Sequence, residues 1–436
     1  MIFRATTPAR RIWPALILPA LAAGMLAAAP GSDSDGPGKR WIGTWATAAQ
    51  PALPGPPETF RNQTVRLIVH TSAGGAKPRV RISNTYGTRP LTIGSAHITL
   101  RSGESSISSG SDRTLKFRGK TSVTIPAKSD IISDPVEMTV PALSDVAVSL
   151  YFPDVAEATT SHLAAKQTSY LSTTGDFTGI EKIPDAKPIR TWPFLTGLDV
   201  EVSERGASIV ALGSSLTDGD GSSPNQNRRW TDYLAARLQQ KGGAFAEIGV
   251  LNEGIIGNRL LEDSPEATPY GKVLGESGIA RFDRDVLSQT GVKYVFIALG
   301  VNDIAFPGSL TPASARVSAE ALIAGYRRLI EYAHRKGIQV IGTTNPPFED
   351  SFLESRGGTR VTFFTPEKEA VRVAVNEWIL TAGNFDAVVD FDAAVRDPSH
   401  PAHILPGFDS GDHIHPNDEG YEATASLVPL NLFIKR

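Results

Sequence analysis

Apolar and polar residues alternate with two different periods along this chain, and the period changes near residue 205. Before that point, apolar side chains recur at every second position in short runs, at 65–70, 79–83, 96–100, 122–125, 136–140 and 146–152. Glycine or proline separates these runs at 74–75, 87, 103 and 126. A period of two is typical of half-buried strands, and short strands with regular turns favour an antiparallel, β-sandwich-like domain. We expect this β-rich domain to span residues 41–203.

After residue 206 the pattern changes to strands that alternate with helices. Short apolar runs predict strands at 207–212, 246–251, 294–299, 338–343 and 387–391. Apolar residues spaced by three and four predict helices at 230–238, 317–336, 366–380 and 419–432. Strands that alternate with helices favour a parallel sheet with both faces covered. The second domain, residues 204–436, is therefore predicted to be α/β.

The first 29 residues differ in composition from both domains. Three arginines precede an apolar stretch, 12–29, which contains two prolines and ends in small residues. This order is that of a secretory signal peptide, and a membrane anchor would need about 20 predominantly apolar residues. The adjacent Arg10 and Arg11 also fit a twin-arginine signal. We therefore expect cleavage of 1–29, export to the periplasm or medium, a flexible linker at 30–40, and no stable membrane association.

Composition narrows the classes of partner. The chain has 436 residues and no cysteine, so it has neither disulfides nor thiolate metal ligands, and its length allows two hydrophobic cores. Its 43 basic and 46 acidic residues nearly cancel. A near-neutral chain gives no reason to expect nucleic acid or an anionic membrane as partner. We expect a small-molecule or carbohydrate ester as substrate, and the oligomeric state stays open.

A candidate catalytic residue follows directly after the first predicted strand of the second domain. Ser215 lies in GSSLTDG, directly after the strand 207–212, and Asp412 precedes His415 by three residues near the C-terminus. A serine hydroxyl becomes a good nucleophile only when a base takes its proton and a third group orients that base. His415 and Asp412 could fill these roles. His413 is the rival base, but it is too close to Asp412 along the chain to bind it easily.

Two further motifs follow strands of the same predicted sheet. Residues 252–258 read NEGIIGN and residues 300–303 read GVND. With the serine and histidine blocks, Ser215, Gly257, Asn302 and His415 resemble the four signature positions of the SGNH hydrolases, also called GDSL esterases. The resemblance extends from about residue 207 to the C-terminus. Segments 41–50 and 79–96 are also similar to the β-rich half that accompanies the hydrolase domain in one branch of that family.

The resemblance implies a flavodoxin-like three-layer fold, a serine nucleophile and no cofactor. It also implies an oxyanion hole formed by the backbone amides of Ser215 and Gly257 and by the side-chain amide of Asn302. Each of these residues also has an alternative interpretation. The serine could cap a helix, Gly254 could be the oxyanion donor in place of Gly257, and the asparagine side chain could form hydrogen bonds with the backbone of its own turn. The polar, glycine-rich run 217–227 delays the next helix until about Arg229, which argues against a simple cap.

One position departs from the family pattern. Most members have aspartate before the serine, whereas Ser214 stands there in this chain. Ser214 can make hydrogen bonds locally, so we expect it to tune the turn or the surroundings of the histidine. The sequence predicts an exported serine esterase for short acyl groups, including acetyl groups on carbohydrate.

The alternative function is a non-catalytic glycan-binding protein with a decayed hydrolase site. Ser214 is the only feature of the sequence that supports this alternative. For the esterase, exposed tryptophans would favour a carbohydrate substrate through stacking on sugars; the candidates are Trp41, Trp45, Trp192 and Trp230, although core packing explains a tryptophan at least as often. A metal site is a further alternative, because several side chains could gather around a divalent ion: Asp218, Asp220, Asp303, Asp412, His413 and His415. The paired ligand spacings of a zinc site are absent from the sequence, so we expect no catalytic metal.

Overall fold

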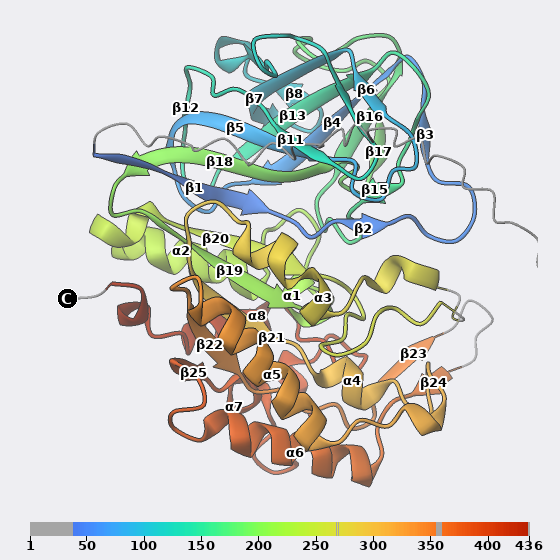
Figure 1. Cartoon of the computed structure of the whole chain (residues 1–436), viewed down its shortest axis with the longest axis vertical. Helices are drawn as coiled ribbons and strands as arrows, with labels where there is room; N and C mark the ends of the chain where they lie inside the picture. Colours follow the sequence, from blue (N-terminus) through green and yellow to red (C-terminus); the bar gives the residue numbers. More distant parts are fainter. Residues whose placement is uncertain (1–37, 267, 269, 355–359, 435–436) are drawn as a thin grey trace, which may run out of the picture.

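The computed structural model describes residues 38–266, 268, 270–354 and 360–434. A β part extends from β1 to β18 and an α/β part follows from β19 onward, and the two lie one above the other in Figure 1. The predicted signal peptide and most of the predicted linker lie outside the described residues. Strand β1 begins at Lys39, so it starts inside the segment predicted to be linker.

Two larger antiparallel sheets form most of the described β part, beside three sheets of two strands each. One contains, in order, β1 (Lys39–Ala46), β18 (Leu195–Ser203), β5 (Gly75–Ser83) and β11 (Asp130–Ile132), with β12 (Thr139–Val140) also on β5. The other contains β17 (Lys187–Ile189), β16 (Ser169–Thr174), β4 (Gln63–His70), β13 (Asp145–Phe152), β7 (Ser95–Gly103) and β8 (Ser106–Ile107), with β9 (Arg113–Thr114) also on β7. Alternate residues of both sheets share one apolar core, as the period of two predicts.

The α/β part is built on a parallel sheet of five strands. Their order is β20 (Ile248–Gly254), β19 (Ala207–Gly213), β21 (Val292–Ala298), β22 (Gln339–Thr343) and β25 (Ala387–Val389). Numbered along the chain within this part, the order is 2-1-3-4-5, which is the flavodoxin-like arrangement. The predicted fold class is therefore confirmed.

Helices cover both faces of this sheet. Ile209 and Ala211 of β19 face one apolar core, and Val210 and Leu212 face the other. The first core holds α2 (Trp230–Lys241), α7 (Phe391–Val395) and α8 (Asp418–Ser426); the second holds α3 (Gly278–Phe282), α5 (Ala319–His334) and α6 (Pro366–Leu380). In Figure 1 this sheet and its helices lie below the β part.

Some predicted boundaries are wrong for identifiable reasons. The predicted helix 419–432 divides into α8 and a 3-10 turn at Leu430–Phe433, since Pro429 has no amide hydrogen to continue a helix. A helical turn, α1 (Ser215–Asp218), begins at the serine, whereas the sequence predicts no helix before about Arg229. The long helix after it, α2, begins at Trp230 as expected.

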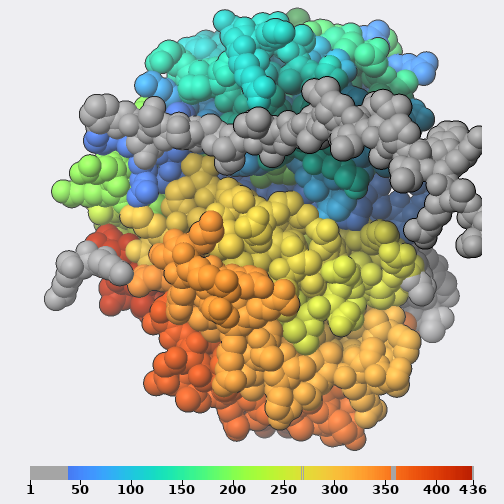
Figure 2. Space-filling model, viewed as in Figure 1, coloured from blue at the N-terminus to red at the C-terminus, as the bar shows by residue number. Residues whose placement is uncertain are grey.

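The β part packs directly on the sheet of the α/β part. The amide of Gly43 in β1 donates to the hydroxyl of Ser208 (3.0 Å) and to the carbonyl of Thr290 (3.1 Å), and the amide of Val250 donates to the hydroxyl of Ser72 (2.8 Å). In the space-filling view the blue surface of the β part meets the yellow surface of the α/β part (Figure 2). Among the described residues, no helix has both the length and the apolar character that a bilayer span requires.

Candidate active site

The serine block lies at the carboxyl edge of the parallel sheet. Strand β19 ends at Gly213, Ser214 is extended (φ −103°, ψ −155°), and Ser215 is the first residue of α1. The amides of a first helical turn have no partner within the helix. Among the described residues, the amides of Ser215 and Gly257 donate to no protein acceptor. Both are therefore free to donate to a bound group.

Ser215, His415 and Asp412 form one hydrogen-bonded chain. Nε2 of His415 lies 2.8 Å from Oγ of Ser215, and Nδ1 lies 2.6 Å from Oδ2 of Asp412. The second carboxylate oxygen, Oδ1, accepts the backbone amides of His415 (2.9 Å) and Ile414 (3.1 Å). The histidine ring is thus held from one side by the carboxylate and presents its other nitrogen to the serine.

Burial and charge act in opposite directions on the two titratable members. Burial alone would raise the pKa of Asp412, but the hydrogen bond and the charge of His415, together with two backbone amides, lower it to about 2. Burial alone would lower the pKa of His415, but the hydrogen bond that its ring donates to Asp412 and the charges of Asp220 and Asp412 outweigh it, so this pKa is raised. Asp412 therefore stays ionised at neutral pH and stabilises a protonated histidine.

The rival histidine has its own partner. Nδ1 of His413 lies 2.5 Å from Oδ2 of Asp409, and the side chain is 45% exposed. His413 also has a positive φ of 63°, so the backbone turns there and brings the next residues back toward Asp412. The structure thus brings His415, and not His413, to Ser215.

The glycine block forms a tight loop beside the serine. The amide of Ile255 donates to the carbonyl of Gly213 (3.1 Å), which ties the loop to the end of β19. Gly257 has a φ of +68°, a conformation that favours glycine. At Gly254 a Cβ atom would lie 2.3 Å from the backbone nitrogen of Asp218. Gly254 is therefore needed for close packing against α1, which leaves Gly257 as the candidate oxyanion donor.

Asn302 reaches the same loop from α4 (Val301–Ala305), which follows β21. Its Nδ2 donates to the carbonyl of Asn258 (3.0 Å), so the side chain does not simply satisfy its own turn. The neighbouring Asp303 accepts the amides of Leu260 (2.7 Å) and Leu261 (2.9 Å), and burial raises its pKa to about 6. These contacts hold the loop after Gly257 and leave the second amide hydrogen of Asn302 available.

Ser214 does not make the local hydrogen bonds expected of it. The residue is fully buried, and its Oγ has no partner among the described residues. The side chain of Ser214 therefore does not stabilise the turn. The backbone carbonyl of Ser214 does so instead, because it accepts the amides of Thr217 and Asp218 at the start of α1 (both 2.9 Å).

The aspartates considered as metal ligands have separate partners. Asp218 lies 2.9 Å from Nε2 of His162, and Asp220 lies 2.7 Å from Nζ of Lys166. Within the part of the chain that the structure describes, no group of three or more suitable side chains gathers for a metal ion. His162 and Lys166 come from the β part, and no local motif in the sequence marks either residue, so neither was predicted.

The carboxyl edge of a flavodoxin-like sheet is where proteins of this fold bind their ligands. The arrangement at this edge is that of an acyl-transfer enzyme. A profile described as GDSL-like Lipase/Acylhydrolase matches residues 209–428. This chain belongs to that family and is a carboxylic ester hydrolase.

Several solved structures are similar to the chain. An aryl esterase from M. smegmatis is 18% identical, with 51% of this chain and 95% of that chain covered and a TM-score of 0.36. A GDSL-like lipase from Bacteroides thetaiotaomicron is 18% identical, with 50% and 84% covered and a TM-score of 0.32. A carbohydrate acetylesterase from Sinorhizobium meliloti is 18% identical, with 50% and 94% covered and a TM-score of 0.35. A search of curated proteins found no match.

Proposed function

We propose that this chain hydrolyses esters of short acyl groups through a Ser-His-Asp triad and an acyl-enzyme. The observation that carries the proposal is the chain of two hydrogen bonds from Asp412 through His415 to Ser215. In this proposal His415 takes the serine proton as Oγ attacks the ester carbonyl, and then protonates the leaving alcohol. Water next attacks the acyl-enzyme, again with His415 as base.

The oxyanion of each tetrahedral intermediate would lie against three donors. These are the backbone amides of Ser215 and Gly257, which have no acceptor among the described residues, and the second side-chain hydrogen of Asn302. Donors fixed by the fold before substrate binds stabilise the developing charge without further reorganisation. No cofactor has a role in this scheme.

The tryptophans give little support to a sugar-binding platform. Trp45, Trp192 and Trp230 are 8%, 4% and 1% exposed, and each packs edge-on against another aromatic ring. The guanidinium group of Arg79 lies over the ring of Trp41, with its central carbon 4.2 Å from the centre of that ring. Buried rings cannot stack on a sugar, so we define the proposed substrate by its short acyl group and include acetylated carbohydrate as one alcohol component.

A panel of chromogenic esters tests this function. Purified protein should have its highest kcat/KM on acetate or butyrate esters of p-nitrophenol and a lower value on the decanoate, with no change on addition of EDTA. Acetylated xylan in the same assay measures whether a carbohydrate alcohol is accepted. Protein that is folded but inert on every ester would favour the glycan-binding alternative, and activity lost in EDTA and restored by a divalent ion would favour the metal site.

Replacement of the proposed oxyanion donor should reduce turnover strongly. Asn302→Ala removes one of three donors and is expected to lower kcat by about 100- to 1000-fold, since single oxyanion-hole donors have effects of this size. KM should change far less, because the donor acts on charge that develops in the transition state. Steady-state kinetics on p-nitrophenyl acetate measure both constants. An unchanged kcat in a folded Asn302→Ala variant would remove Asn302 from the proposed oxyanion hole.

The acid limb of the pH profile of activity should reflect the ionisation of His415. The base must be neutral to accept the serine proton, so activity falls as pH drops through its pKa. Because this pKa is raised, the limb should lie above the usual value of about 6.5 for histidine. The charge of Asp220 contributes to the raised pKa, so Asp220→Asn should move the limb to lower pH. A limb that stays in place in this variant would show that another group controls it.

We also propose that the chain is exported and that its β-rich and α/β domains meet between residues 203 and 204. The order of charged, apolar and small residues in 1–29 supports a signal peptide. The strands from β1 to β18 pair only with one another among the described residues, and the same is true of those from β19 to β25. This pairing supports a division between residues 203 and 204.

A further inference from the structure

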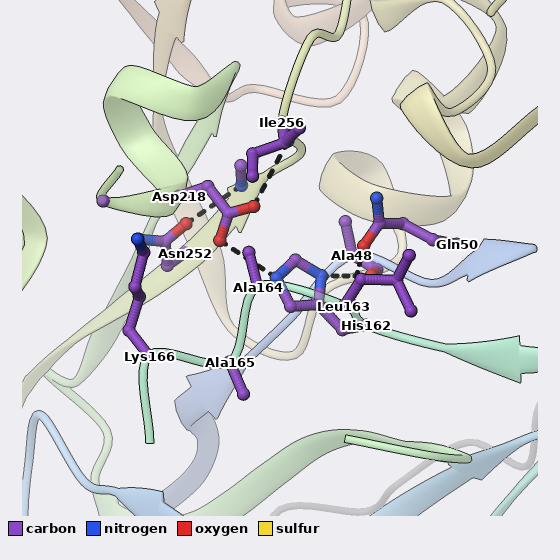
Figure 3. Close-up of polar contacts among 12 residues, drawn as sticks. Ala48, Gln50, His162, Leu163, Ala164, Ala165, Lys166, Asp218, Asn252 and Ile256 are labelled. Atoms are coloured by element: carbon purple, nitrogen blue, oxygen red, sulfur yellow. Dashed lines mark hydrogen bonds and ion pairs between the residues drawn. The ribbon is translucent and has the colours of Figure 1, made fainter. Parts of the chain in front are cut away.

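A buried histidine of the β part contacts the α/β part close to the nucleophile. His162 follows β15 (Thr160–Ser161), and its Nε2 lies 2.9 Å from Oδ1 of Asp218, the last residue of α1 (Figure 3). Both side chains are only 2% exposed. Burial of an ionisable pair costs free energy that an apolar pair of similar volume would not, so packing alone does not account for these two residues.

The hydrogen bonds of His162 define where its protons lie. Nδ1 is 3.0 Å from the carbonyl oxygen of Ala48, which can only accept, so Nδ1 carries a hydrogen. Nε2 faces a carboxyl oxygen of Asp218, and a short contact there requires one more proton between the two atoms. The ring therefore connects a backbone carbonyl of the β part to a carboxyl group of the α/β part in a fixed orientation.

Asp218 also contacts the loop that contains Gly257, the candidate oxyanion donor. Its other oxygen, Oδ2, accepts the amide of Ile256 (3.2 Å), the residue directly before Gly257. Asp218 itself lies three residues after Ser215 on the same helical turn. Figure 3 shows the Asp218 carboxyl group between the His162 ring and the backbone at Ile256. One carboxyl group therefore links the nucleophile turn, the oxyanion loop and the β part.

Neighbouring contacts hold the same segment of the β part in place. Nζ of Lys166 lies 2.7 Å from Asp220. Arg229 donates to the carbonyl of Ala165 (2.6 Å) and to the carbonyl of Asp218 (2.6 Å). The segment 162–166 thus contacts the α/β part mainly at residues 218–220 and 229, which surround the end of α1. The β part therefore contacts the helical turn that begins with Ser215, the proposed nucleophile.

We propose that His162 is a positioning residue for ester hydrolysis. Through Asp218 it fixes the amide of Ile256, and with it the direction of the Gly257 amide toward the oxyanion. This inference rests on the proposed function, in which Gly257 is an oxyanion donor. The catalytic centre of the α/β part is accordingly complete only when the β part is docked on it, and a misplaced donor weakens stabilisation of the transition state more than binding of the substrate.

A matched pair of substitutions separates the two hydrogen bonds of His162. In His162→Asn the amide nitrogen takes the place of Nδ1, so the contact with Ala48 is kept and that with Asp218 is lost. In His162→Gln the amide nitrogen reaches the place of Nε2, so the contact with Asp218 is kept. Thr290→Val is the control for the interface in general. It removes the hydrogen bond from Thr290 to Asp199 (2.8 Å) near the amino end of β21, opposite the serine.

The readouts are kcat and KM on p-nitrophenyl acetate and the affinity for phenylboronic acid, whose adduct with a serine mimics the tetrahedral intermediate. His162→Asn should lower kcat by roughly 10- to 100-fold and weaken the boronate by a similar factor, with KM within about twofold. His162→Gln and Thr290→Val should keep kcat within about threefold of the wild type. Melting temperatures of all variants separate loss of stability from loss of positioning.

Three results would overturn the proposal. They are a folded His162→Asn protein with wild-type kcat, equal losses in the Asn and Gln variants, and an equal loss in Thr290→Val. If His162→Asn does not fold, His162→Gln decides: wild-type-like kcat and boronate affinity support the role, and a loss of both overturns it. Failure of the proposed function is recognised separately, because Ser215→Ala would then retain activity.

Discussion

Ser215→Ala and His415→Ala are each expected to lower kcat for ester hydrolysis by roughly four to six orders of magnitude. The first removes the atom that forms the acyl-enzyme, and the second removes the base 2.8 Å from it. Because the two side chains act as one unit, the double variant should be no slower than either single variant. Steady-state kinetics on p-nitrophenyl acetate, with circular dichroism to check the fold, measure these losses.

His413→Ala is the matched control for the base. This histidine is two residues away and is paired with Asp409, whereas Ser215 is in contact with His415, so the His413 variant should keep most of the wild-type kcat. Retention of more than about a few per cent of activity in Ser215→Ala would contradict the nucleophile assignment. A loss in His413→Ala as deep as that in His415→Ala would exclude His415 as the single base.

Asp412→Asn should have the next largest effect, a fall in kcat of about three to four orders of magnitude. Oδ2 of Asp412 accepts from Nδ1 of His415 (2.6 Å), while Oδ1 accepts two backbone amides. An asparagine that keeps its oxygen on those amides must turn an N–H group toward the ring, which reverses the tautomer. Nε2 would then carry the hydrogen and could not accept the serine proton.

The same substitution should also change the pH profile. Asp412 raises the pKa of His415 through both its hydrogen bond and its charge, so the acid limb of any residual activity should move to lower pH in Asp412→Asn. The limb of Asp220→Asn should move in the same direction but with kcat retained at high pH. Wild-type turnover in Asp412→Asn would mean that the ring is oriented by another group, and would contradict the triad.

Local patterns in the sequence predicted the frame that positions the site. The change of period near residue 205 predicted both the antiparallel sheets and the parallel sheet, because alternation and helical spacing follow directly from which side chains face a core. Ser215, Gly257 and Asn302 each follow a strand of one parallel sheet, so the carboxyl edge places them together. The 2.8 Å contact between Ser215 and His415 joins residues 200 positions apart, and the sequence linked the two only through their chemistry and the family resemblance.

The sequence patterns did not predict contacts between residues that lie far apart in the chain. His162 carries no motif, and its contact with Asp218 exists only because the β part packs over the end of β19. The tryptophans illustrate the same limit, since composition cannot distinguish a buried ring from an exposed one. Ser214 was expected to make local hydrogen bonds, yet its buried Oγ has no hydrogen-bond partner among the described residues.

Covalent labelling with a p-nitrophenyl phosphonate tests the central claim most directly. A phosphonate reacts with a serine only when a base activates the hydroxyl and an oxyanion hole holds the tetrahedral product, so it requires Ser215, His415 and the three donors together. The account predicts one phosphonyl group per wild-type chain, located by peptide mass spectrometry on Ser215, and none on His415→Ala. A chain that stays unlabelled, or an adduct on another residue, would contradict it.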